Sequence, residues 1–214
     1  MGYFLDPALL ESAIRKAETG CGAEFAVVST RASGRYNSVT GPVVLAVQGV
    51  TLLALTLAEK TDVWGQWHWL QDSQSSVIIL LCTGLVAFLV LWFWPRLRVW
   101  LAPSREKAAQ VREAALAVFA DAGLACTSHR RTVLVFVSEL ERRIDIVVDM
   151  GLREVFPEHV IIELEKEWSA RFRKKTHSAT IASLLDHLAK TVAGAGFGPG
   201  SLSAQELSDK PLQR

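Results

Sequence analysis

Four carboxylates form the best candidate for a functional site in this 214-residue sequence. Asp145 and Asp149 lie in a segment of alternating polarity, and Glu206 and Asp209 lie in the C-terminal tail. If the fold brings them together at a sheet end, their oxygens could hold Ca²⁺ or Mg²⁺. Such an ion could orient a phosphate and polarise its oxygen for hydrolysis. The spacing matches no calcium loop, so a solvated position for Asp145 and Asp149 remains the alternative, and no cofactor is certain.

Residue types that supply a nucleophile or a zinc site are present but poorly arranged. Ser138 ends a predicted strand, and no G-x-S-x-G turn surrounds it. The five histidines include no pair at i, i+4 and no cysteine partner, which argues against zinc. The sequence therefore identifies no catalytic residue, and the balance is against an enzyme.

A basic cluster ends one of the predicted helices. It consists of Arg171, Arg173, Lys174 and Lys175. Positive charge at a helix C-terminus is favourable, which is the simpler interpretation. The alternative is contact with anionic lipid headgroups, worth about 1 kcal/mol per charge close to the surface.

Composition limits the partners. The formal net charge of +1 argues against a nucleic-acid-binding surface, which is usually strongly basic. Of the three cysteines, Cys82 lies within an apolar run, which leaves Cys21 and Cys126 as the only plausible pair in water.

Two uncharged runs dominate the first half of the chain. No charged side chain occurs between Arg35 and Glu59, or between Asp72 and Arg96. About 20 helical residues cross a bilayer core of roughly 30 Å. We therefore predict transmembrane helices over residues 37–58 and 75–95, joined by a polar loop over 59–74. The alternative is a pair of buried helices in a soluble protein.

The flanks of these runs predict an orientation. Tryptophans occur in the connecting loop and after the second run, as an interfacial aromatic belt requires. They are Trp64, Trp67, Trp69, Trp92, Trp94 and Trp100. A tryptophan-lined ligand site in the loop is the alternative. Two arginines precede the first run, and three arginines and a lysine follow the second; they are Arg31 and Arg35, then Arg96, Arg98, Arg105 and Lys107. The loop carries a formal charge of −2, so we predict that both termini are cytosolic.

The remaining sequence must supply the elements that position these side chains. Asp6 and Pro7 begin a helix, residues 23–30, 132–138 and 143–149 read as strands, and further helices begin near Ser104, Glu158 and Ser178. Strand 143–149 alternates, which predicts one covered and one wetter face. The pattern predicts an α+β or α/β domain, with a small mixed sheet covered by helices.

This domain is interrupted by the predicted transmembrane hairpin. Residues 1–35 supply its first helix and strand, and residues 103–196 supply the rest. Residues 197–214, which follow a glycine-rich exit, are predicted to form a flexible polar tail.

Four stretches of this domain resemble the TPM-domain family, once known only as a domain of unknown function. They are AIRKAETGCGAEFAVVST, HRRTVLVFVSELERRIDIVVDMGL, ELEKEWSARFRKK and QELSDKP. The resemblance implies a helix–sheet–helix sandwich at a bacterial-type inner membrane. It also implies a relationship to thylakoid acid phosphatases and to family members that bind calcium.

The leading functional hypothesis is therefore an interaction, assembly or maintenance module at the membrane surface. Its expected partners are membrane lipids and another membrane protein, with no nucleic acid. The alternative is a Ca²⁺- or Mg²⁺-assisted phosphatase that uses the four carboxylates. A transporter is the weakest hypothesis, because neither predicted span carries a charge.

Overall fold

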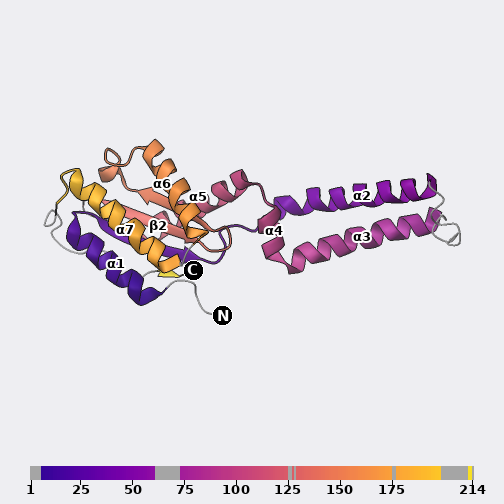
Figure 1. Ribbon diagram of the computed structural model, residues 1–214, viewed down its shortest axis with the longest axis horizontal. Coiled ribbons are helices and arrows are strands. Elements are labelled where there is room, and N and C mark those ends of the chain that lie inside the picture. The colour runs from indigo at the N-terminus through magenta and orange to yellow at the C-terminus, as the bar shows by residue number, and fades with distance from the viewer. Residues whose placement is uncertain are drawn as a thin grey trace. The chain divides into compact units, whose positions relative to one another are not determined.

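The computed structural model describes residues 6–60, 73–124, 127, 129–174, 177–198 and 212–213. The chain forms two compact units (Figure 1). One comprises Met1–Gly34 and Arg105–Arg214, and the other comprises Arg35–Ser104. The first unit is thus assembled from two separated segments of the chain.

A small mixed sheet lies at the centre of the first unit. Its strands are β1 (Glu24–Thr30), β2 (Thr132–Ser138), β3 (Arg143–Val148) and the two-residue β4 (Leu212–Gln213), in the order β3-β2-β1-β4. β1 is parallel to β2 and to β4, whereas β2 and β3 are antiparallel. The domain is therefore a mixed α+β fold. The sequence predicted no strand within 197–214, and yet β4 extends the sheet there.

Helices cover both faces of the sheet. α1 (Pro7–Gly20), α6 (Glu158–Phe172) and α7 (His177–Gly194) enclose one core with alternate residues of the three longer strands, such as Phe25, Val135 and Ile146. α5 (Ser104–Asp121) encloses a second core on the opposite face, against Leu134 and Phe136. The strands read as apolar runs because their side chains are buried on both faces.

Asp6 begins α1 as its sequence predicts. The Asp6 carboxylate accepts a hydrogen bond from the Ala8 amide at 3.1 Å, and Pro7 occupies the first helical position. The Asp6 amide also donates to the Ser178 hydroxyl at 2.7 Å. This bond joins the start of α1 to α7, and the two helices lie side by side in Figure 1.

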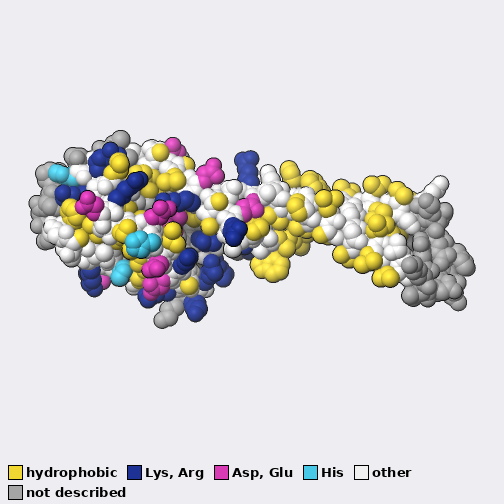
Figure 2. Space-filling view, turned by 90° about the horizontal axis from the view of Figure 1, so that it is seen from above, with side chains coloured by type: hydrophobic (Ala, Val, Ile, Leu, Met, Phe, Trp, Pro, Cys, Tyr) yellow, Lys and Arg dark blue, Asp and Glu magenta, His cyan; other side chains and the backbone are white. Residues whose placement is uncertain are grey.

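The second unit is a helical hairpin. It contains η1 (Asn37–Val39), α2 (Thr40–Lys60), α3 (Ser73–Phe93) and α4 (Pro95–Leu101). α2 and α3 are long and apolar enough to cross a membrane. In Figure 2 the described part of α2 and α3 presents mainly hydrophobic and uncharged side chains. Trp64, Trp67 and Trp69 lie outside the described residues.

One amide side chain joins the two long helices. Gln48 on α2 donates to the Leu80 carbonyl at 2.9 Å and accepts from the Thr83 hydroxyl at 3.4 Å. In lipid, where no water is available, such an interhelical hydrogen bond supplies a partner for the polar amide side chain.

α4 was not predicted from the sequence. α3 ends at Phe93, and Trp94 leaves helical geometry with φ −115° and ψ 80°. The residue before a proline is disfavoured in the α region, so Pro95 ends one helix and begins the next.

Candidate functional site: a groove beside strand β3

The face of β3 that carries Asp145 is covered. Asp145 and Asp149 are only 5% and 4% exposed. The expectation of a wetter face was wrong at these positions. At Asp145 the reason is that α5 packs over this side of the sheet, where it also buries Val147. Alternation in β3 therefore separates two buried environments rather than a core from solvent.

A groove of about 700 Å³ lies between α5 and α6, beside β3. Its volume lies within the range of small-ligand pockets, roughly 300–1,000 Å³. Its apolar lining consists of Val111, Ile144, Val148, Phe156, Ile161 and Ile162, with smaller residues of α5 and Pro157. Its charged lining consists of Arg112, Arg143, Arg153 and Lys166, opposed by Asp145, Glu158 and Glu165. The groove thus combines an apolar surface with charges of both signs.

A charged triad forms one wall of this groove. The Arg112 guanidinium donates to the Asp145 carboxylate at 2.9 Å and lies 3.8 Å from Glu165. The same guanidinium nitrogen donates to the Ile146 carbonyl at 3.1 Å. The Asp145 side chain is 8% exposed and that of Glu165 is 22% exposed, so both carboxylates have largely lost their water. One arginine therefore faces two carboxyl groups that lie close together.

The pKa of Glu165 is raised from 4.5 to about 7, first by burial and then by the nearby charge of Asp145. The Ile146 amide and the Arg112 guanidinium oppose this rise. Glu165 therefore exchanges a proton near neutral pH. A strongly perturbed carboxyl in a groove is a functional-site candidate with a physical basis, although structural networks also produce such shifts.

α6 also closes the outer edge of β3. The Ile144 amide donates to the Ser169 hydroxyl at 3.0 Å, and the Ile146 amide donates to Glu165 at 3.0 Å. The Ser169 hydroxyl in turn donates to the Ile144 carbonyl at 3.3 Å. An open edge would invite pairing with another chain, so these side chains protect the sheet. They also fix α6 as one wall of the groove.

Asp149 belongs to a separate local arrangement. Its Oδ1 accepts from the Met150 amide at 2.6 Å, at the start of η4 (Met150–Leu152), and lies 3.6 Å from the Arg130 guanidinium. Its Oδ2 is buried and has no hydrogen-bond partner among the described residues. Asp149 therefore caps a turn and keeps one oxygen that a ligand could use.

Ser138 has a structural environment. Its hydroxyl donates to the Glu141 carboxylate and accepts from the Ser33 hydroxyl at 2.8 Å. The Ser33 amide also donates to Glu141, at 3.1 Å. These contacts join the β2–β3 turn to the chain after β1. They supply no histidine base for a nucleophile.

The predicted metal ligands are only partly described. Asp145 and Asp149 each face an arginine, and Glu206 and Asp209 lie outside the described residues. Within the described ranges, no three His, Cys, Asp or Glu side chains are grouped to hold a metal ion. The four-carboxylate site stays a prediction.

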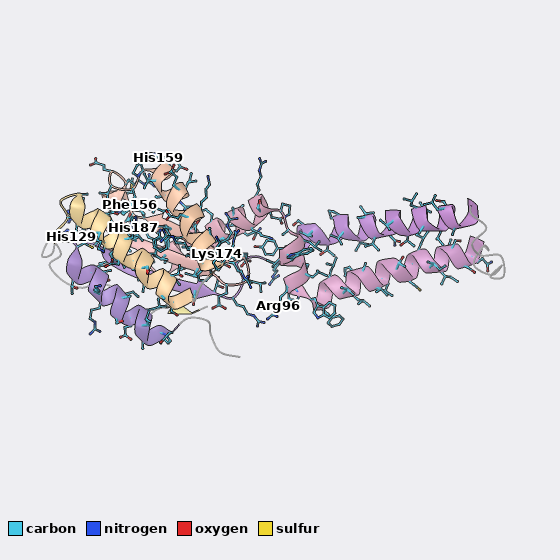
Figure 3. The ribbon with its side chains drawn as sticks, in the orientation of Figure 1. Arg96, His129, Phe156, His159, Lys174 and His187 are labelled. Atoms are coloured by element: carbon cyan, nitrogen blue, oxygen red, sulfur yellow. The ribbon has the colours of Figure 1, made fainter. Side chains whose placement is uncertain are left out.

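The basic cluster at the end of α6 is partly engaged within the protein. Arg171 pairs with Glu167 and lies over the Trp168 ring, 4.6 Å from its centroid. Arg173 donates to the Arg142 carbonyl at 3.4 Å. Lys174 is exposed (Figure 3), and Lys175 lies outside the described residues. Lipid contact by this cluster stays a prediction.

Arg112 and Glu165 were missed in the sequence. Each lies on a predicted amphipathic helix, where a charged residue normally faces water. They are 33 and 20 positions from Asp145, so no local spacing connects the three. The one available signal was a charged residue, Asp145, between two apolar residues in the middle of a predicted strand.

Comparison with known proteins supports the fold. No family model and no curated protein matches the sequence. Among solved structures, the chain is similar to the NMR structure of the BA42 protein from the psychrophilic bacterium Bizionia argentinensis. The two share 12% identity with a TM-score of 0.57, over 100% of this chain and 98% of that chain. At this identity the likeness concerns the fold alone.

Proposed function

We propose that this chain is an integral membrane protein whose TPM-like domain binds another membrane protein. In this role it assists assembly or maintenance of a membrane complex. α2 and α3 provide the anchor, since large side chains such as Leu45 and Leu81 are 73% and 68% exposed. Such surfaces are stable in lipid and costly in water.

The groove beside β3 is the observation that carries the interaction role. Ile162 on α6 lines it and is 41% exposed, next to charged side chains of both signs. Interfaces gain most of their energy from a few well-packed apolar contacts surrounded by polar groups. A partner segment with an apolar anchor and flanking charges fits this surface.

The binding test compares two exposed apolar side chains. Full-length protein is cross-linked in native membranes, purified in mild detergent and analysed by quantitative mass spectrometry. Ile162→Arg should reduce the recovered membrane partner at least tenfold, because it places a charge in the apolar lining. Leu116→Arg on α5 is the matched control, since Leu116 is 46% exposed and does not line the groove. Equal recovery from both variants, or a lone monomer from wild type, would contradict the proposal.

The topology follows from the positive-inside bias, and we infer cytosolic termini. Reporter fusions after Arg214 test this inference: one reporter fluoresces only in the cytosol and the other is active only outside. A fluorescent fusion without outside activity is expected. The opposite pattern would reverse the topology without affecting the groove.

A second candidate, the metal-assisted phosphatase, rests on Asp149. Its buried Oδ2 is available to a cation, although Arg130 nearby opposes one. Calorimetric titration with Ca²⁺ and release of inorganic phosphate from a model ester test this candidate. Asp149→Asn should abolish both signals, and Asp186→Asn, an exposed carboxylate paired with Lys190, should leave both intact. Unchanged calcium affinity in Asp149→Asn would exclude this mechanism.

A further inference from the structure

We propose that α4 is an interfacial helix that docks on anionic phospholipid headgroups at the base of the hairpin. This inference rests on the proposed membrane anchoring and adds a specific lipid contact to it. The contact is separate from the basic cluster at the end of α6. It uses residues of the second unit only.

Exposed aromatic side chains gather where α3 ends. Trp92, Phe93 and Trp94 are 63%, 73% and 65% exposed, and Trp100 on α4 is 76% exposed. Four large aromatic rings within nine residues would be unfavourable in water. Tryptophan is enriched where the hydrocarbon core meets the headgroups, because its indole is apolar and carries one N–H donor. The continuity of this cluster with α3 places it at the bilayer boundary.

α4 has distinct inner and outer sides. Val99 is 5% exposed and faces inward, and α4 contacts α3 and η1. Arg96 and Trp100 are four positions apart, so they are neighbours on one helix face, and both are exposed (Figure 3 labels Arg96). A guanidinium beside an indole suits a surface that presents phosphates above acyl chains.

A polar connection holds this outer face in place. The Arg98 guanidinium donates to the Asn37 side chain at 2.9 Å and to the Arg35 carbonyl at 3.3 Å. These bonds join α4 to the residues that precede α2. Arg98 is therefore a positioning residue, and Arg35 and Arg96 are both exposed.

Charge complementarity selects an anionic lipid. Each basic side chain near a membrane surface increases its affinity for anionic lipid about fivefold. Guanidinium also forms paired hydrogen bonds with phosphate oxygens. Arg35 and Arg96 together should therefore produce a preference for phosphatidylglycerol over phosphatidylcholine of more than tenfold.

The depth of α4 is tested by fluorescence quenching in reconstituted vesicles. Full-length protein is compared with Trp100→Phe, and the difference spectrum isolates Trp100 from the other six tryptophans. Lipids brominated near the headgroup should quench this difference at least twice as strongly as lipids brominated near the chain ends. Quenching by aqueous iodide, with no effect of either brominated lipid, would overturn the proposal.

Lipid selectivity is tested by native mass spectrometry of full-length protein in mixed micelles. Wild type should retain phosphatidylglycerol over phosphatidylcholine, and Arg35→Gln/Arg96→Gln should reduce that preference about tenfold. Arg15→Gln is the control, because Arg15 is an exposed arginine on α1. A parallel variant, Arg171→Gln/Lys174→Gln, reports on the α6 cluster. If only this second variant loses selectivity, α4 is not the lipid site.

Extraction with alkaline carbonate separates this inference from the proposed function. Release of the protein from membranes would remove the anchor and with it both proposals. Retention in the membrane, combined with no shallow quenching and no loss of selectivity, would overturn the role of α4 alone.

Discussion

Glu165 connects the groove to the stability of the sheet. One of its oxygens accepts from the Ile146 amide, and its charge competes with that of Asp145 for Arg112. Its proton occupancy therefore affects both a groove wall and the edge of β3. The same carboxyl group thus accepts a hydrogen bond from the edge of β3 and titrates near neutral pH.

Stability should fall as pH rises through this group. Its pKa in the folded protein, about 7, is above the ordinary value of 4.5, so the folded state binds more protons between these pH values. The contribution of Glu165 is thus fully present below about 4.5 and is lost by about pH 7, with an upper limit of roughly 3 kcal/mol. Glu165→Gln should have a flatter profile of Tm against pH from 4.5 to 7, measured by circular dichroism in detergent. Glu167→Gln, an exposed control, should retain the wild-type slope. Equal slopes in all three proteins would contradict this role.

Arg112 should stabilise the folded protein by pairing with the buried Asp145 carboxylate. Arg112→Met leaves the Asp145 carboxylate buried without its closest cation, so we expect a loss of about 1–3 kcal/mol. Because Arg112 is 44% exposed, solvent reduces the loss below that of a fully buried pair. Asp145→Asn in the same chain should recover part of it. Denaturant titration of each single variant and of the double variant measures the recovery. Strict additivity of the two single substitutions would argue against direct coupling.

At the scale of elements, α6 protects β3 through two side chains rather than through backbone pairing. Ser169 satisfies both polar groups of Ile144, and Glu165 satisfies the amide of Ile146. α6 is thus attached to the sheet edge by residues one helical turn apart, and the groove lies next to this attachment. Any movement of α6 would change the groove and the edge together.

Ser169→Ala should loosen this edge. The substitution leaves the buried Ile144 amide without its partner, which costs about 1–3 kcal/mol. Hydrogen–deuterium exchange should accelerate in β3 and remain unchanged in β1, which is paired on both sides. Ser183→Ala is the control, since Ser183 is an exposed serine on α7 whose hydroxyl donates to the Ala179 carbonyl of the same helix. Faster exchange across the whole sheet would indicate global destabilisation instead.

At the scale of the whole molecule, the first unit forms a continuous sheet although its two chain segments are separated by the second unit in the sequence. β1 pairs with β2 over seven residues from each strand, although the entire second unit lies between them in the sequence. At the junction, a Cβ added to Gly34 would lie 2.7 Å from the Gln110 side chain. The chain thus leaves the first unit after β1 and re-enters it close to the same place.

Replacement of residues 35–104 by a short Gly/Ser linker should therefore yield a folded, water-soluble domain. All described side chains of the two hydrophobic cores belong to the first unit, so neither core loses one of them. The expected result is a cooperative thermal transition and a monomer by size-exclusion chromatography. Gly34→Ala in this shortened chain should leave Tm nearly unchanged, because the flexible end of the Gln110 side chain can move aside. Aggregation of the shortened chain would mean that the hairpin contributes to the fold.

Sequence reasoning identified the local elements well because their determinants are local. The Asp6–Pro7 helix start, the three longer strands and the two long apolar helices follow from caps, periodicity and the absence of charge. It missed α4 because a seven-residue helix after a proline has too short a pattern to recognise. It also missed β4, since two residues carry no periodicity.

The sequence by itself determined which residues are apolar, where the chain turns and where uncharged runs are long enough to cross a bilayer. Only the tertiary structure decided that α5 covers the Asp145 face of β3, and that Arg112 and Glu165 meet this carboxylate from two different helices. The reason is physical. Periodicity reports that a side chain alternates with its neighbours, but its burial and its pKa depend on which distant helix packs against it.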